Sequence, residues 1–217
     1  RLRNHPSLAL WCGNNENEIS YFEWGWNRTL TKEQRKHYES GLRRLFYETV
    51  PEAIAMEDDT RYYHPSSPSA GHSGVPYSMG DAHMWSVWKG GWVEEYLKPH
   101  NIARFMSEYG FISYPDMFTL RKFVPEWDME RNSPTMLAHH RAYDDTTRDP
   151  EYSNKTICRY MSRYAWVPED FEEFVFMTQW FQAEVVKVAV EAHRRAKPYC
   201  MGTLFWQLND CWPVVSW

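Results

Sequence analysis

Two glutamates stand apart from the other acidic residues because each follows a short apolar segment. The chain carries 29 Asp and Glu residues, most of which must be solvated at the surface. Glu16 comes after residues 11–15 (Trp-Cys-Gly-Asn-Asn), and Glu108 comes after residues 105–107 (Phe-Met-Ser). Either glutamate alone could be an ordinary loop carboxylate or an ion-pair partner. Together they favour paired carboxylate chemistry such as glycoside hydrolysis, in which one carboxylic acid protonates the leaving oxygen and the other attacks or activates water.

The aromatic content of the chain is compatible with a sugar substrate. Phe, Trp and Tyr make up 17% of its 217 residues, with 12 Trp and 14 Tyr. An indole offers a broad apolar face and one N–H donor, which suits a sugar ring with an apolar C–H face and hydroxyls at its rim. A Trp-rich hydrophobic core is the alternative, and composition alone favours that alternative.

Short apolar segments alternate with helical patterns or long loops along the chain. Thr31 begins a helix with a capping box, because Gln34 follows three residues later, and amphipathic spacing continues to about residue 47. Strands are predicted at residues 7–12, 61–63, 83–88, 102–108 and 202–208, with loops at residues 14–27 and 64–80. Further helices are predicted from residue 51 to the acidic residues 57–59 and at residues 116–123, 135–141, 152–164 and 168–196. In the last helix the predicted buried stripe is Phe171, Phe174, Thr178, Phe181, Val185, Val188 and Ala192.

This alternation indicates parallel βα units. Functional residues of such folds lie on loops after the C-terminal ends of the strands. Polar clusters follow predicted strands repeatedly, at residues 14–16, 108–110 and 209–210. We therefore expect one shared catalytic face in an α/β fold.

Composition excludes several classes of function. The net charge of −5 and a pI near 6.0 give no basic field for nucleic acid. No apolar run of 18 or more residues predicts a membrane span. The four cysteines and the pair His139 and His140 lack metal-ligand spacing, and no phosphate-binding glycine loop occurs. The sequence implies neither a metal nor an organic cofactor.

Three segments carry a resemblance to a known family. Residues 3–7 (Arg-Asn-His-Pro-Ser), Trp11 and residues 13–16 (Gly-Asn-Asn-Glu) are similar to the acid/base signature of glycoside hydrolase family 2. Residues 107–111 (Ser-Glu-Tyr-Gly-Phe) resemble its nucleophile segment. Residues 206–213 (Trp-Gln-Leu-Asn-Asp-Cys-Trp-Pro) resemble its last barrel strand, in the form carried by β-mannosidases and related exo-β-glucosaminidases. The resemblance extends from Arg1 to Trp217.

The resemblance implies a (β/α)₈ TIM barrel with the acid/base after strand 4 and the nucleophile after strand 7. The five predicted strands then become strands 4–8, so that residues 1–217 are a partial catalytic barrel domain without strands 1–3 and the accessory β-domains. Such a half-barrel has two exposed sheet edges, and we expect it to need the remaining part of the same polypeptide to fold and act.

The same resemblance implies roles for single residues. Glu16 matches the general acid/base, in preference to Glu18, and Glu108 matches the nucleophile. Asn15 matches the asparagine that holds the sugar 2-hydroxyl. The substrate-facing tryptophans are expected to be Trp206, as the platform under the −1 sugar, Trp24, near the leaving-group sugar, and Trp85 and Trp88, as pocket walls, with core packing an open alternative for one of the last two.

The implied activity is that of a retaining, exo-acting glycoside hydrolase that removes terminal β-D-mannose by double displacement. Its partner is an oligosaccharide or glycoside substrate. Exo-β-glucosaminidase, β-galactosidase and β-glucuronidase activities of the same family remain alternatives, as does a catalytically dead sugar-binding module. Retention of the anomeric configuration requires the two carboxyl groups to lie about 5–5.5 Å apart.

Overall fold

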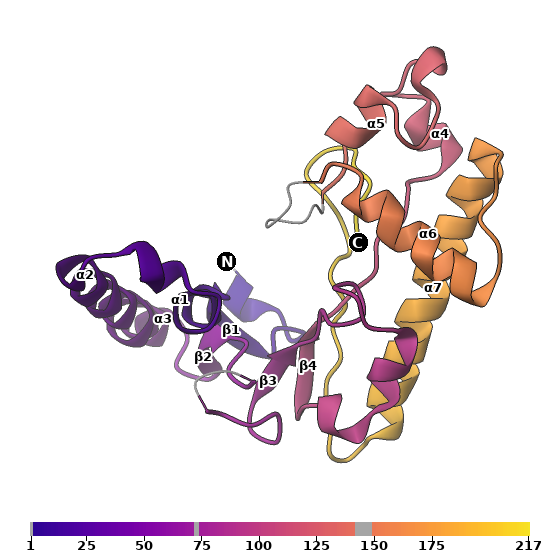
Figure 1. Ribbon diagram of the computed structural model, residues 1–217. Coiled ribbons are helices and arrows are strands. Elements are labelled where there is room, and N and C mark those ends of the chain that lie inside the picture. Colours follow the sequence, from indigo (N-terminus) through magenta and orange to yellow (C-terminus); the bar gives the residue numbers. More distant parts are fainter. Residues whose placement is uncertain (1, 72–73, 142–148) are drawn as a thin grey trace. The chain divides into compact units, whose positions relative to one another are not determined.

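The computed structural model describes residues 2–71, 74–141 and 149–217, and the chain divides into two compact units. The first unit comprises Arg1–His83 and Ala103–Ser107, and the second comprises Met84–Ile102 and Glu108–Trp217. Both strands and helices are present, as the α/β prediction requires (Figure 1). Among the described residues, no helix combines the length and the apolar character needed to cross a bilayer.

The first unit is built on short strands joined by a helical crossover. Strand β1 (Leu10–Asn15) pairs with the parallel strand β2 (Tyr62–Ser67), in a register that sets Asn15 opposite Ser67. Parallel neighbours cannot be joined by a tight hairpin, so the chain between them must cross over. This crossover consists of α1 (Asn17–Phe22), η2 (Trp26–Thr29), α2 (Lys32–Arg43), η3 (Arg44–Thr49) and α3 (Val50–Glu57). Strand β3 (Asp81–His83) forms a second two-stranded sheet with β4 (Phe105–Glu108).

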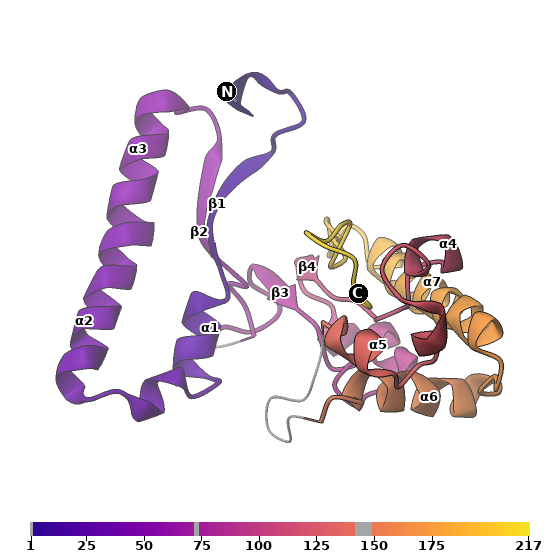
Figure 2. The ribbon, with the colours of Figure 1, turned by 90° about the horizontal axis from the view of Figure 1, so that it is seen from above.

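Helices α2, η3 and α3 follow one another without a break, so they form one long helical run (Figure 2). The predicted capping box is confirmed, because Gln34 N donates to Thr31 Oγ1 at 3.2 Å and Thr31 N donates to Gln34 Oε1 at 2.8 Å. The run has no buried residue, and it is joined to β2 by a 2.8 Å hydrogen bond from the Tyr63 hydroxyl to the Phe46 carbonyl oxygen. The prediction of a loop at residues 14–27 was wrong in part, because these residues include α1 and the start of η2.

Helices dominate the second unit, and its longest helix differs slightly from the prediction. Helix α7 (Phe171–Arg195) begins three residues after Pro168, because Asp170 is the N-cap and accepts a 2.9 Å hydrogen bond from Glu173 N. Five members of the predicted stripe are buried, whereas Phe171 and Val188 are half-buried. The other elements are η4 (Val93–Leu97), η5 (Pro99–Asn101), α4 (Met117–Leu120), η6 (Glu126–Asp128), α5 (Pro134–Ala138) and α6 (Tyr152–Tyr164).

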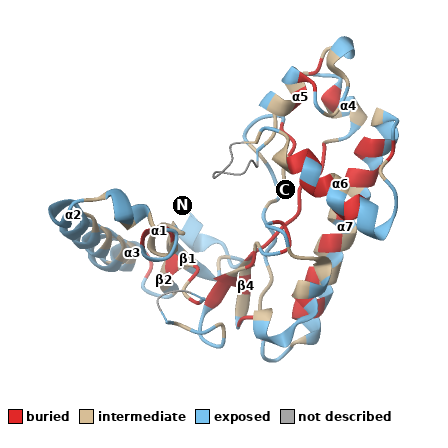
Figure 3. Cartoon of the chain, in the orientation of Figure 1, coloured by how far each residue is buried: buried red, intermediate tan, exposed pale blue. Residues whose placement is uncertain are grey.

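Aromatic side chains form much of the core of the second unit. The Phe111 ring meets Trp88 and Tyr160 edge to face, with centroids 5.3 and 4.7 Å away. Buried residues lie along α6 and α7, whereas α2 and α3 are largely exposed (Figure 3). Helix α6 has the bounds that the sequence predicted.

Two predicted strands are wrong. The segment at residues 83–88 leaves the strand after His83, and residues 202–208 form no named strand. Around Trp206 the backbone finds partners only at separate points: Trp206 N donates to Tyr109 O at 2.8 Å, and Gln207 N donates to Trp217 O at 3.0 Å. A strand needs a neighbour along its length. Within the described ranges, the chain therefore pairs four strands in two sheets rather than five in one.

Candidate active site

The backbone of Glu16 is fixed on both sides. Glu16 directly follows β1 in a left-handed conformation, with φ of 60° and ψ of 5°. A residue with a side chain adopts this conformation only where its surroundings impose it. Its N–H donates to the Ser67 carbonyl oxygen at 2.7 Å, and its own carbonyl oxygen accepts from Ser20 N at 3.0 Å. These contacts set the direction in which the Glu16 side chain leaves the strand end.

The Glu16 carboxyl group meets a histidine. Glu16 Oε1 lies 2.6 Å from His83 Nδ1, and the two side chains are 20% and 4% exposed. The other ring nitrogen, His83 Nε2, lies 3.0 Å from the Ser67 hydroxyl oxygen. Histidine can therefore exchange or share a proton with Glu16, while its second nitrogen is held by a hydroxyl.

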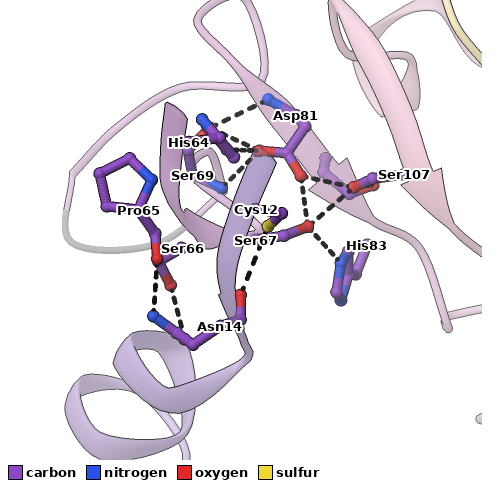
Figure 4. Close-up of polar contacts among 11 residues, drawn as sticks. Cys12, Asn14, His64, Pro65, Ser66, Ser67, Ser69, Asp81, His83 and Ser107 are labelled. Atoms are coloured by element: carbon purple, nitrogen blue, oxygen red, sulfur yellow. Dashed lines mark hydrogen bonds and ion pairs between the residues drawn. The ribbon is translucent and has the colours of Figure 1, made fainter. Parts of the chain in front are cut away.

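Next to His83, the carboxylate of Asp81 is bound by several polar side chains (Figure 4). Asp81 Oδ2 accepts hydrogen bonds of 2.6 Å from the hydroxyls of Ser67 and Ser107. Asp81 Oδ1 accepts from Ser69 N at 2.8 Å and from Ser69 Oγ at 2.6 Å, and it lies 2.9 Å from His64 Nε2. Burial opposes ionisation of Asp81, but the hydrogen bonds, led by that from His64, hold its pKa well below the ordinary value. Asp81 is thus an ionised acceptor.

Asp81, His83 and the serines around them were not among the predicted site residues. Their side chains come from β2, β3 and β4 and from the residues just after β2, so only the folded chain brings them together. A usable signal was present, because residues 64–69 read His-Pro-Ser-Ser-Pro-Ser and precede a strand that begins with Asp81 and ends with His83. Polar side chains in such short strands need partners once they are buried.

The two asparagines before Glu16 have different surroundings. Asn14 is bound on both sides of its amide: Nδ2 donates to Pro65 O at 2.8 Å, and Oδ1 accepts from Ser66 Oγ at 3.1 Å. Asn15, at the end of β1, is exposed. The amide of Asn14 is therefore a structural link between β1 and β2, whereas that of Asn15 is accessible to a ligand.

Glu18 lies in α1, two residues beyond Glu16, and has a partner of its own. Its Oε1 accepts a 2.5 Å hydrogen bond from the Tyr47 hydroxyl on η3. Burial, together with this bond to a carboxylate, raises the pKa of Tyr47 above its ordinary value. Glu18 thus links two helical segments of the first unit.

The second unit holds Glu108, and its carboxyl group meets an indole. Glu108 is 7% exposed, and its Oε1 accepts a 2.9 Å hydrogen bond from Trp85 Nε1. Its carbonyl oxygen accepts from Met84 N at 2.8 Å, which fixes the backbone beside Trp85. The Trp85 ring lies edge to face with Trp217, at a centroid distance of 5.4 Å. Glu108 is held by a donor that cannot accept a proton, in contrast to the histidine beside Glu16.

Trp206 lies close to the same segment. A Cβ atom on Gly110 would lie only 2.3 Å from the Trp206 carbonyl oxygen, so glycine is required where the two backbones approach. The Trp206 side chain is 36% exposed. With Trp217 and Asp210, it lines a cavity of about 470 Å³ in the second unit.

The other two predicted tryptophans differ in exposure. Trp88 is 4% exposed and packs edge to face against Phe111 and Tyr152. Core packing, which was left open for one of Trp85 and Trp88, therefore applies to Trp88, whose ring has almost no surface left for a sugar. Trp24, in the first unit, is 46% exposed and lies 6.4 Å from the ring of Trp26.

The predicted site residues are divided between the units. Asn15, Glu16 and Trp24 belong to the first unit, whereas the second unit contains Glu108 and the remaining tryptophans, Trp85, Trp88 and Trp206. Neither unit by itself gathers three metal-ligating side chains among the residues that the structure describes. His140 is half-buried, and the desolvation of its ring lowers its pKa to about 4.

Comparisons with known proteins agree with the resemblance. No family model matches the chain. The chain is 32% identical over 229 residues to a protein named β-mannosidase B from Aspergillus clavatus, and 30% identical over 225 residues to β-mannosidase B from Emericella nidulans. Each match covers 100% of this chain and 26% of the relative.

A solved structure gives the same result. The crystal structure of a β-D-mannosidase from Dictyoglomus thermophilum matches with a TM-score of 0.80 and 36% sequence identity, covering 100% of this chain and 25% of that one. The chain spans about a quarter of the length of the proteins that it matches. Along its whole length, the chain is similar in sequence and in fold to these proteins named β-mannosidase.

Proposed function

We propose that this chain carries the two catalytic carboxylates of a retaining β-mannosidase, with Glu16 as general acid/base and Glu108 as nucleophile. The observation that carries the proposal is the matched placement of these two glutamates at strand ends. Glu16 follows β1 and Glu108 ends β4, and each carboxyl group lies within hydrogen-bond distance of a ring nitrogen. Their unlike partners suit unlike roles.

In the proposed first step, Glu108 attacks the anomeric carbon of a terminal β-mannoside, and the bond to the leaving oxygen breaks. Glu16 gives its proton to that oxygen, so the leaving group departs as an alcohol and a glycosyl-enzyme remains. In the second step, Glu16 takes a proton from water as the water oxygen attacks the anomeric carbon. The Glu108 carboxylate is released, and the anomeric configuration is retained.

The surroundings of Glu108 support its role as nucleophile. The Trp85 N–H binds one carboxylate oxygen, and the low exposure of the side chain keeps bulk water away. A carboxylate held by a fixed donor loses little orientational freedom when it attacks. The second oxygen is the one proposed to bond to carbon.

Glu16 has surroundings that suit a group whose protonation must change twice in each turnover. His83 is within proton-transfer distance of Glu16, and His83 is connected in turn to the ionised Asp81. Proton-transferring groups work best when their protonation is balanced near the operating pH.

For the sugar itself, we propose that Asn15 holds the 2-hydroxyl and that Trp206 lies under the −1 ring. The exposure of Asn15 at the end of β1 and the partly exposed indole of Trp206 support these roles. Trp85 would then border the sugar through its ring edge, and Trp24 would meet the leaving-group side. Trp88 is left out of the sugar site because it is buried.

We further propose that β1–β4 correspond to strands 4–7 of a (β/α)₈ barrel, that residues 202–208 take the place of strand 8, and that the rest of the barrel lies elsewhere in the polypeptide. The parallel pairing of β1 with β2 across a helical crossover supports this view. So does the alignment of the whole chain with about a quarter of each β-mannosidase.

The deciding experiment is an assay of the full-length protein on a panel of aryl β-glycosides. The proposal predicts rapid release of β-mannose and much slower release of β-glucose, β-glucosamine, β-galactose and β-glucuronate. Proton NMR of the first product should show retained β-configuration. Sugar binding without turnover of any aryl glycoside would contradict the catalytic proposal, and comparable rates on the β-mannoside and the β-galactoside would contradict the specificity.

A further inference from the structure

The hydrogen-bond chain behind Glu16 fixes the position of one proton. Asp81 has a depressed pKa, and an ionised carboxylate can only accept hydrogen bonds. Ser67 Oγ lies 2.6 Å from Asp81 Oδ2, so the single hydroxyl proton of Ser67 points to Asp81. His83 Nε2 lies 3.0 Å from the same hydroxyl oxygen, which has no other proton to give. His83 Nε2 must therefore carry a hydrogen and donate it to Ser67.

This assignment leaves His83 Nδ1 facing Glu16. The 2.6 Å separation of Nδ1 from Glu16 Oε1 requires one proton between the two atoms. That proton resides either on the carboxyl group, beside a neutral imidazole, or on the ring, beside a carboxylate. If it is lost, the lone pair of Nδ1 faces the negative Oε1 at hydrogen-bond distance, which is unfavourable unless the ring changes its tautomer.

We propose that Ser67 and Asp81 are positioning residues that lock His83 in the form with hydrogen on Nε2 and so keep one proton on the Glu16–His83 pair. This inference rests on the proposed acid/base role of Glu16 and deepens it. Neither Ser67 nor Asp81 is required to touch the substrate. They act through His83 on the group that does.

Other titratable groups surround this relay. His64 on β2 lies 2.9 Å from Asp81, and its hydrogen bond to Asp81 raises its pKa. Cys12 on β1 has its pKa raised by burial and by the charge of Asp81. Glu108 ends β4, the strand that pairs with β3, and is a further carboxylate of that sheet. Ser67 is the group that joins the charge of Asp81 to the His83 ring.

Removal of the Ser67 hydroxyl should make the pair lose its proton more easily. In Ser67→Ala, the hydroxyl that accepts from His83 Nε2 is removed, so the tautomer with hydrogen on Nδ1 becomes more favourable. That hydrogen then bonds to the Glu16 carboxylate, which stabilises the deprotonated pair. Because the deprotonated pair cannot act as the acid, the alkaline limb of the kcat/KM profile should move to lower pH. A shift of about one pH unit corresponds to one hydrogen bond of ordinary strength.

The first test compares pH profiles of kcat/KM for the full-length protein on an alkyl β-mannoside, whose poor leaving group needs the proton. Ser67→Ala should shift the alkaline limb downward, and Ser67→Thr, which keeps a hydroxyl, should restore it. Ser69→Ala is the matched control, because Ser69 also bonds to Asp81 but has no bond to His83. An unshifted limb in Ser67→Ala, or a uniform loss of rate at every pH, would overturn the relay and leave Ser67 a structural residue only.

The second test does not depend on activity. Neutron diffraction of deuterated crystals of the full-length protein, at a pH above the alkaline limb or at pH 9 if no turnover is found, locates the ring hydrogens directly. The wild type should carry deuterium on Nε2 of His83, and Ser67→Ala should carry it on Nδ1. A bare Nε2 in the wild type would refute the relay. If the wild type hydrolysed no glycoside, the proposed function would fail while this measurement still decided the position of the proton.

Discussion

Glu16 and Glu108 carry the same functional group in opposite kinds of surroundings. Glu16 lies against His83, and hydrogen bonds lead from the His83 ring through the Ser67 hydroxyl to the ionised Asp81. Glu108 is 7% exposed and accepts from an indole N–H, a group that donates but does not exchange its proton at any ordinary pH. A titratable neighbour suits a carboxyl group that must gain and lose a proton, whereas a fixed orientation suits one that must attack carbon. The difference between the two neighbours supports the proposal that Glu16 is the acid/base and Glu108 the nucleophile.

The largest effect is expected from removing the attacking carboxylate. Glu108→Gln should lower kcat of the full-length protein on every aryl β-mannoside by about 10⁴-fold or more, because no other group can form the glycosyl-enzyme. The matched control is Glu172→Gln, a change of an exposed glutamate on α7 that should leave the rate unaltered. Burst kinetics with a dinitrophenyl mannoside should show the loss of the covalent intermediate. Retained turnover in Glu108→Gln would remove Glu108 from the chemistry.

Removal of the Glu16 carboxyl group is expected to have an effect that depends on the leaving group. Glu16→Ala should slow alkyl mannosides by about 10²–10⁴-fold, because their leaving oxygen must be protonated. Glycosylation by dinitrophenyl mannosides should slow far less, because that leaving group departs as an anion. Glu18→Gln is the control, since Glu18 is bound to Tyr47. Equal losses on both substrate types, or a larger loss in the control, would contradict the assignment of Glu16.

Asn15, the residue before Glu16, is expected to affect the choice between sugars. Mannose differs from glucose only by its axial 2-hydroxyl, so discrimination must come from groups around that position. Asn15→Ala should lower kcat/KM on β-mannosides by about 10²–10³-fold, the usual effect of removing one donor that acts in the transition state.

Two comparisons control the Asn15 experiment. In Asn15→Ala, the kcat/KM on a 2-deoxy substrate should fall much less, because that substrate lacks the hydroxyl that Asn15 would contact. Asn14→Ala should lower the melting temperature, because Asn14 joins β1 to β2, and it should not change the ratio of mannoside to glucoside rates. If the 2-deoxy and the parent substrates lost rate equally, Asn15 would not be the 2-hydroxyl contact.

The parts of this structure that were predicted well depend on neighbours in sequence. The capping box of Thr31 and Gln34 needs only four residues, and helix α6 follows from its own periodicity. The strand predicted at residues 202–208 failed because a strand exists only where a partner runs beside it, and Trp206 and Gln207 find separate acceptors. The two glutamates were singled out because each follows a short apolar segment and lies in a family motif. His83 and Asp81 were missed because the contacts that give them a role come from strands distant in sequence.

The smallest catalytic effect should come from the indole that holds the nucleophile. The Trp85 N–H donates to Glu108 Oε1 at 2.9 Å, and a hydrogen bond to a charged group contributes roughly 1.5–3 kcal/mol. Trp85→Phe keeps an aromatic ring but removes the donor. If about half or more of that stabilisation is specific to the attacking geometry, kcat should fall about 10- to 100-fold.

The comparison between the two carboxylates makes the Trp85 prediction specific. Because Trp85 orients a nucleophile and moves no proton, Trp85→Phe should slow glycosylation of alkyl and dinitrophenyl mannosides by the same factor, unlike Glu16→Ala. Trp127→Phe, at an indole that is 85% exposed, is the matched control and should leave the rate unchanged. A loss in Trp85→Phe that grew as the leaving group became poorer would mean that the indole acts on the acid rather than on the nucleophile. The contrast between the two glutamates would then have to be abandoned.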